Sequence, residues 1–124
     1  MLRAFATACV LAALAPPAHA FLTTNDLIVE PSGADSFHVP YRGLSGASDF
    51  WCAAGDYVIR HLHLPPDTRI FRLSSPPRRA GQGVTFALSS EGAQRTGLLI
   101  FGDRLSVSAA HARQLCEVPR LIAD

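Results

Sequence analysis

The stretch DFWCAAGDYVIRHL, residues 49–62, decides the expected fold, because its apolar residues recur at the spacing of an α-helix. At about 100° per residue, one face carries residues of low polarity: Trp51, Gly55, Val58 and Leu62. The opposite face carries Asp49, Ala53, Asp56 and Arg60, which predicts a solvated side with an i, i+4 ion pair. Residues 49–62 are therefore predicted to form the main helix, with Ser48 as its N-cap and Pro65-Pro66 after its end.

Gly55 falls in the middle of this helix, where glycine costs about 1 kcal/mol relative to alanine. Its place on the packed face predicts that another backbone or an aromatic ring approaches the helix closely there.

Two cysteines lie on core-facing positions of predicted helices. Cys52 borders the apolar face of the main helix, and Cys116 shares a face with Ala109 and Ala112 in a short C-terminal helix. Ser106 or Ser108 would cap that second helix. A disulfide between them would close the loop from residue 52 to residue 116. In the loop-entropy model such a bond contributes roughly 4 kcal/mol to the free energy of unfolding. We therefore expect a Cys52–Cys116 disulfide; two buried free thiols are the alternative.

Short apolar or alternating segments predict the strands. Residues 27–29 and 37–41 form an expected hairpin, residues 68–74 and 84–89 two further strands, and the continuous apolar run 97–102 a central strand. The expected fold is α+β, with about five mostly antiparallel strands, one main helix and a short C-terminal helix, stapled by one disulfide.

The first twenty residues have the layout of a secretory signal peptide, with a cation, a short apolar run, two prolines and an Ala-His-Ala end. A retained anchor is the alternative; lipidation at Cys9 is rejected because only eight residues precede it. Residues 21–124 would then be a single exported α+β domain, periplasmic or secreted. Removal of Arg3 and Cys9 leaves 10 basic residues, 10 acidic residues and two cysteines.

Composition excludes several classes of protein. The 124 residues are 48% hydrophobic with a formal charge of +1, which does not fit a disordered polar chain, a coiled coil or a multi-span membrane protein. All basic residues are arginines without a long run, so no nucleic-acid partner is expected, and after signal cleavage no membrane span.

Residues with metal-binding or catalytic chemistry are few. His61, His63 and Asp67 are weak metal candidates, because zinc sites need three or four convergent ligands. The alternative is a solvated helix end. Ser45 is not in a nucleophile motif, and Cys52 has no partner at Cys-x-x-Cys spacing, so no catalytic residue is assigned and no cofactor is expected.

Arginines give the clearest candidate binding residues. Arg78 and Arg79 are adjacent in the turn-rich loop 76–83, and Arg72 precedes it closely. Guanidinium groups bind carboxylate, phosphate or sulfate through paired hydrogen bonds, so an envelope protein or an anionic polymer is a conceivable partner. A simply solvated loop is the alternative.

The segments FWCAAGDY (50–57) and PPRRAGQG (76–83), with a second cysteine near the C-terminus, resemble small exported proteins of Gram-negative bacteria. No activity is established for that group, so the resemblance implies export and domain size but no reaction.

The expected function is therefore an exported binding or interaction module rather than an enzyme. Alternatives are a small metal-dependent or hydrolytic envelope enzyme, and a protein inhibitor of an exported enzyme that presents loop 76–83. Two arrangements would help to decide: convergence of His61, His63 and Asp67, and a concave pocket next to Trp51.

Overall fold

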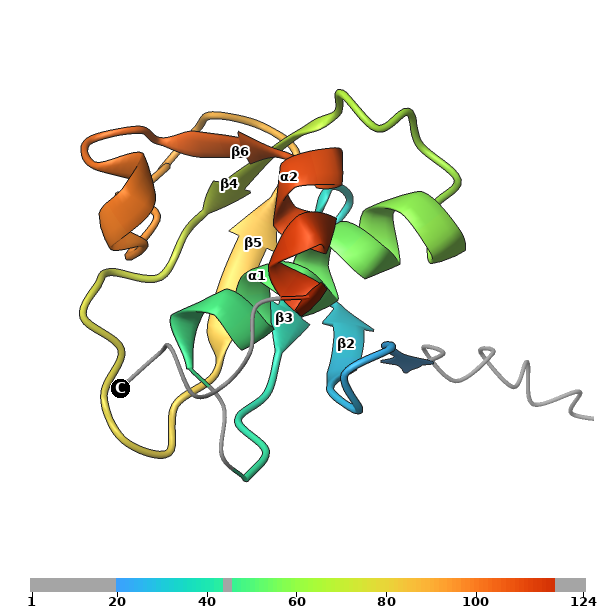
Figure 1. Ribbon diagram of the computed structural model, residues 1–124, viewed down its shortest axis with the longest axis horizontal. Coiled ribbons are helices and arrows are strands. Elements are labelled where there is room, and N and C mark those ends of the chain that lie inside the picture. Colours follow the sequence, from blue (N-terminus) through green and yellow to red (C-terminus); the bar gives the residue numbers. More distant parts are fainter. Residues whose placement is uncertain (1–19, 44–45, 118–124) are drawn as a thin grey trace, which may run out of the picture.

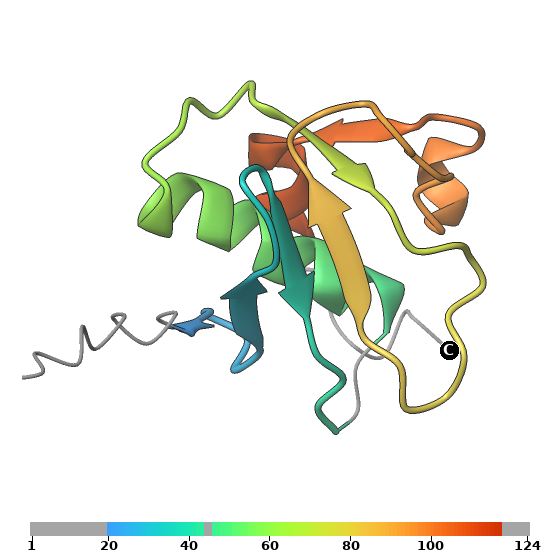
Figure 2. The same ribbon diagram turned by 180° about the vertical axis from the view of Figure 1, so that it is seen from behind.

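The computed structural model describes residues 20–43 and 46–117 (Figure 1). They form an α+β fold whose helices pack on one face of a six-stranded antiparallel sheet, as Figure 2 shows from behind. The strands run in the order β1-β2-β3-β5-β4-β6. Their bounds are β1 Phe21–Leu22, β2 Ile28–Pro31, β3 Ser36–Val39, β4 Arg69–Arg72, β5 Val84–Ala87 and β6 Ser106–Ser108.

In the described part of the chain, two helices and three short helical segments complete the fold. The helix α1 spans Ala47–Asp56 and continues as the π-helix η1, Tyr57–His61. The helix α2 spans Ala109–Gln114 and continues as the 3-10 turn η3, Leu115–Glu117. A separate 3-10 turn, η2, spans Leu99–Phe101. The predicted α+β class, the two helices and the antiparallel pairing are confirmed; the strand count of about five was one too low.

The main helix begins earlier than the sequence predicted. Gly46, not Ser48, is its N-cap, and the Gly46 N–H donates to Asp49 Oδ2 at 2.8 Å. The predicted solvated face is also wrong in part, because Asp56 and Ala53 are fully buried. Helical periodicity could not show that α2 and the turn before β2 close over Asp56 on that side.

The close approach predicted at Gly55 is confirmed. A Cβ there would lie 2.5 Å from the Arg113 nitrogen and 2.8 Å from the Ala109 oxygen. These atoms belong to α2, so the two helices cross with almost no side chain between them. Glycine is needed at this position because any side chain would push α2 away.

The predicted disulfide is present and joins the main helix to the C-terminal helical segment. Cys52 in α1 and Cys116 in η3 are bonded, with their Cα atoms 4.8 Å apart. Ser108 caps α2, since its hydroxyl accepts from the His111 N–H at 3.2 Å. The bond therefore joins two helices that already pack through Gly55.

Aromatic rings fill the space between α1 and the sheet. Trp51 meets Phe86 of β5 edge-on at 4.8 Å between ring centroids, and Phe37 of β3 packs on Tyr57 at 4.7 Å. Trp51, Phe37 and Phe86 are almost fully buried, which is how a small domain obtains most of its core area.

The expected central strand at residues 97–102 is wrong. Gly97 and Gly102 have φ values of 76° and 53°, and between them the chain makes the surface turn η2. A short apolar run cannot distinguish a strand from a helical turn, and these glycines bend the chain out of an extended path. The edge position beside β4 is taken instead by β6, and β1 adds the sixth strand beside β2.

Within residues 20–43 and 46–117, we find no helix with both the length and the apolar character to cross a membrane.

Candidate functional site

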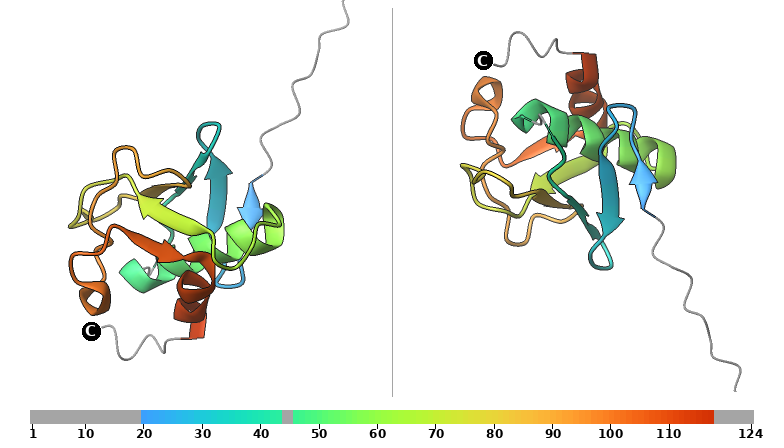
Figure 3. Two further views of the ribbon diagram at one scale, coloured as in Figure 1. Left: turned by 90° about the horizontal axis from the view of Figure 1, so that it is seen from above. Right: turned by 90° about the horizontal axis from the view of Figure 1, so that it is seen from below.

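A pocket of about 760 Å³ opens beside Trp51. The β4–β5 loop and the segment 94–103 supply much of its wall. Figure 3 shows these two segments on the same side of the molecule, away from β1 and β2. Its volume is in the range of small-molecule sites. The walls are formed by Ala47, Phe50, Trp51, Arg72, Pro76, Pro77, Arg78, Val84, Gln94, Arg95, Gly97, Leu98, Leu99, Gly102 and Asp103.

Arg72, the last residue of β4, is the most unusual residue of this wall. Only 3% of it is exposed. Its Nε donates to the Ser74 carbonyl at 2.8 Å, and Nη1 donates to the Thr96 carbonyl at 3.2 Å. Nη2 is buried and has no hydrogen-bond partner among the described residues. The guanidinium is thus held in place with one donor group unused.

No carboxylate oxygen in residues 20–43 and 46–117 lies within 4.0 Å of Arg72. Burial lowers the pKa of Arg72, and the positive charge of Arg78 lowers it further. Both effects mean that the charged form is less stable here than in water, although an arginine remains protonated at neutral pH. A negative group entering the pocket would stabilise that charge.

The Thr96 carbonyl joins Arg72 to the tryptophan. It accepts from Trp51 Nε1 at 2.9 Å as well as from Arg72, and Thr96 is fully buried. Trp51 is the only tryptophan of the chain. Its indole therefore shares a hydrogen-bond acceptor with the buried guanidinium.

Arg78 supplies a second guanidinium to the same pocket. It lies over the rings of Phe50 and Tyr41, at 4.9 and 5.3 Å from the ring centroids, and donates to the Gln82 carbonyl at 2.8 Å. These contacts orient the side chain at the pocket wall. Of the three arginines predicted as anion ligands, the structure brings Arg72 and Arg78 together, whereas Arg79 is exposed and is not part of the wall.

The remaining wall is divided between apolar and polar groups. Pro76, Pro77, Val84 and Leu98 give an apolar surface, and Gln94 gives an amide. Arg95 and Asp103 lie at 4.0 Å from each other, with largely exposed side chains. A buried guanidinium beside apolar walls suits a ligand that carries both a negative and an apolar group.

The three metal candidates are not gathered into a site. In the part of the chain that the structure describes, no group of three or more His, Cys, Asp or Glu could hold a metal ion. The His61 ring packs instead on Tyr57 and Phe21, with centroid distances of 5.1 and 5.2 Å. His63 and Asp67 are exposed.

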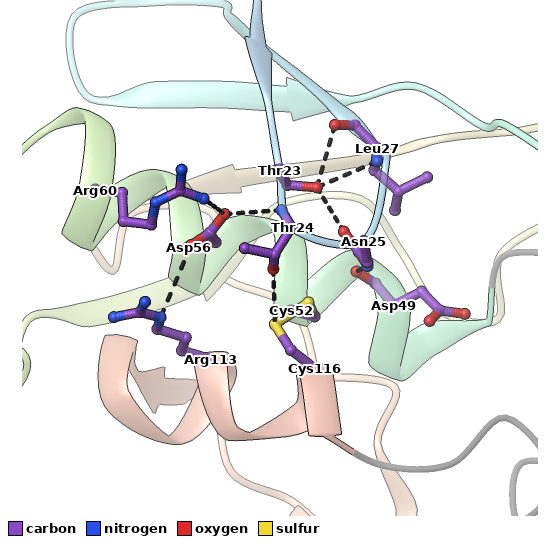
Figure 4. The surroundings of a disulfide bond; sticks show 10 residues. All are labelled: Thr23, Thr24, Asn25, Leu27, Asp49, Cys52, Asp56, Arg60, Arg113 and Cys116. Atoms are coloured by element: carbon purple, nitrogen blue, oxygen red, sulfur yellow. Dashed lines mark hydrogen bonds and ion pairs between the residues drawn. A yellow bond between two sulfur atoms is a disulfide. The ribbon is translucent and has the colours of Figure 1, made fainter.

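Asp56 is a second buried charge, near the disulfide (Figure 4). Its Oδ2 accepts from the Thr24 N–H at 3.0 Å and from Arg60 Nη1 at 2.8 Å, which confirms the predicted ion pair with Arg60. Arg113 Nε lies 3.8 Å from Oδ1. This carboxylate joins the N-terminal turn, α1 and α2, so its surroundings are those of a structural group.

Sequence reasoning missed the contribution of residues 94–98 to the pocket. Thr96 and Gln94 carry no local signal of a binding role, because their position depends on how the chain returns past β4. The isolated bridge between Arg72 and Gln94 makes that connection. Only the tertiary fold places this segment opposite Trp51.

No family model, curated protein or solved structure matches the chain.

Proposed function

We propose that this chain is an exported binding domain that holds a ligand with a negative group and an apolar group in the pocket beside Trp51. The observation that supports it most is Arg72, a buried guanidinium in the pocket wall with no carboxylate beside it among the described residues. An unpaired buried charge is unfavourable for the protein without ligand. A ligand that neutralises this charge therefore gains binding free energy.

Export is supported by two features. Residues 1–20 have the pattern of a signal peptide, and the Cys52–Cys116 disulfide suits an oxidising compartment. We propose that residues 21–124 act in the periplasm or after release from the cell.

The ligand would enter with its anionic group toward Arg72 and Arg78. Two guanidinium groups can share one carboxylate, sulfonate or phosphate, and the proline and leucine side chains would cover the apolar part. The pocket admits a small molecule or the end of a chain. A polymer or an acidic protein partner would therefore be bound by a terminal group.

A matched pair of dyes tests this proposal. Anilinonaphthalene sulfonate carries one sulfonate, and phenylnaphthylamine has the same rings without it. We expect the sulfonate dye to quench Trp51 by energy transfer and to bind the chain from Phe21 about tenfold more tightly than the neutral dye, since one charge-assisted contact contributes about 1.5–3 kcal/mol.

Arg72→Met should abolish this preference, whereas Arg69→Gln should keep it. Arg69 lies on the same strand, and its exposed guanidinium bonds Ser106, so this variant loses an equal charge outside the pocket. Equal affinity for both dyes in the unmodified protein, or a preference that survives Arg72→Met, would contradict the proposal.

A further inference from the structure

The turn η2 carries two aliphatic side chains that the fold does not cover. Leu99 is 100% exposed and Ile100 is 75% exposed. We call these two residues the apolar tip. Leu22, Tyr41 and Leu105 complete the exposed large hydrophobic residues of the described chain, so three of the five lie between residues 99 and 105. Leu99 and Ile100 are adjacent in the chain and both largely exposed, which makes the apolar tip a candidate contact surface.

The apolar tip is held out from the body by its own loop. Gly97 and Gly102 turn the chain on either side of it, with φ values in the left-handed region. Phe101 is half-buried and packs against the core, which anchors the turn from below. In Figures 1 and 2 this orange turn lies at the opposite end of the molecule from the blue strands β1 and β2.

Cations lie at the base of the same loop. Arg95 and Arg104 flank the tip in sequence, and both are exposed. Arg95 approaches Asp103 at 4.0 Å, which joins the two stems of the loop, and the Arg104 N–H donates to the Phe101 carbonyl at 3.1 Å. Residues 93–105 contain two arginines and one acid, so this segment has an excess of one positive charge.

We infer that the apolar tip inserts into the interface of a membrane that contains anionic lipids. Aliphatic side chains on a convex turn can enter the boundary between headgroups and acyl chains individually, to a depth of about 5–10 Å. Arginines behind them then meet the anionic headgroups. A stable protein interface buries about 800 Å² on each partner, and two residues on a protruding turn supply only a small part of such a surface.

This contact does not depend on the ligand of the pocket. Ile100 is outside the pocket wall, whereas Leu99 belongs to both surfaces. The tip would bring the mouth of the pocket close to the lipid surface, while a chain without pocket binding could still attach through Ile100 and Leu99.

Vesicle sedimentation tests the inference with the chain from Phe21 to Asp124. This chain contains every described strand and helix and the disulfide, and it lacks the apolar segment 4–15, which would bind lipid by itself. We expect binding to phosphatidylcholine vesicles that contain phosphatidylglycerol, and weaker binding to phosphatidylcholine alone. Leu99→Ser/Ile100→Ser should lower the vesicle affinity at least about tenfold.

Three variants separate the contribution of the tip from that of the remaining surface. Leu22→Ser removes an exposed leucine from β1 and should leave vesicle binding unchanged. Arg72→Met should also bind vesicles normally, although the dye preference is lost. Arg95→Gln/Arg104→Gln should reduce the difference between the two kinds of vesicle, because the attraction to anionic headgroups is removed.

Lack of binding to phosphatidylglycerol vesicles would overturn the inference, as would unchanged binding of Leu99→Ser/Ile100→Ser. Sedimentation velocity without lipid tests whether a second copy of the chain, instead of a membrane, contacts the apolar tip. A dimer that this double variant converts to monomer would show that the tip is an interface between copies, and the membrane contact would then be rejected. Circular dichroism of each variant confirms that it is folded.

Discussion

Asp56 and Arg72 are both almost fully buried charges, but their surroundings differ. The Asp56 carboxylate is surrounded by donors from three parts of the chain: the Thr24 N–H, Arg60 and Arg113. The Arg72 guanidinium meets two backbone carbonyls and, among the described residues, no carboxylate. Each group keeps one buried atom without a hydrogen bond among the described residues, Asp56 Oδ1 and Arg72 Nη2, but Asp56 has two cations within 4.0 Å whereas Arg72 has no counter-charge at that distance.

The difference separates a structural charge from a candidate binding charge. At the Asp56 end, where α1 meets α2 and the disulfide joins Cys52 to Cys116, the contacts of the carboxylate link three segments of the fold. At the Arg72 end, loops and an open pocket surround the guanidinium. Burial alone therefore does not indicate function; the absence of a counter-charge beside a cavity is the more useful sign.

At the Asp56 end, removal of the disulfide should give the largest change in the free energy of unfolding. Cys52→Ala/Cys116→Ala is expected to lower the free energy of unfolding by about 4 kcal/mol, because the bond restricts a long loop in the unfolded chain. Urea unfolding followed by Trp51 fluorescence measures this. Reduction of the unmodified protein should give a similar loss, and equal stability of the oxidised and reduced forms would show that the bond does not hold this end together.

Removal of the Asp56 charge should give the next largest effect. Asp56→Asn is expected to lower the free energy of unfolding by about 2 kcal/mol. The loss stays moderate because Arg60 and Arg113 are nearly half-exposed and can be solvated. Asp35→Asn, at an exposed position in the β2–β3 turn, is the control with the same charge change. Equal stability of both variants in urea would remove the structural role of Asp56.

Arg72→Met should behave differently from Asp56→Asn. We expect its free energy of unfolding without ligand to change by less than about 1 kcal/mol, because a lost pair of hydrogen bonds is offset by relief of an unpaired buried charge. Urea unfolding beside Arg69→Gln measures it. A loss as large as that of Asp56→Asn would mean that both charges are structural, and the distinction between the two ends would fail.

The smallest expected effect concerns Tyr57, which follows Asp56 in the chain and is buried in the core. Burial raises the pKa of Tyr57 above its ordinary value of 10.0. The unfolded chain therefore loses its tyrosine proton at lower pH than the folded chain, so stability is present below about pH 10 and falls as the pH rises through the folded pKa. Tyr57→Phe should weaken this decline in urea unfolding above pH 10, whereas Tyr41→Phe, at an exposed position, should keep it.

Local sequence patterns predicted much of the structure at the Asp56 end of the molecule. Helical periodicity placed α1, and the glycine on its packed face predicted a close neighbour that proved to be α2. The pairing of Cys52 with Cys116 was predicted from two core-facing positions and from the even count of cysteines outside the predicted signal peptide. The helix and its packed face depend on residues within a few turns of each other. The disulfide depends on the pairing of two cysteines, because each cysteine can bond to only one other.

The pocket was predictable only in its separate parts. Arg72 and Arg78 were candidates for an anion, and a pocket next to Trp51 was an open question, but nothing in the sequence joined these residues to Thr96. The run 97–102 was placed wrongly, because its apolar residues suit a buried strand as well as an exposed turn. Whether this run forms a strand or a turn depends on which segment pairs with β4 at the edge of the sheet.

The sequence by itself determined the class of fold, the main helix and the cysteine pair, because periodicity and covalent pairing act locally. The tertiary structure alone decided that Asp56 is buried, that Arg72 lies in a pocket wall with no carboxylate within 4.0 Å among the described residues, and that Leu99 and Ile100 are exposed. The burial of a side chain and its counter-charge depend on segments distant in the chain, and only packing brings those segments together.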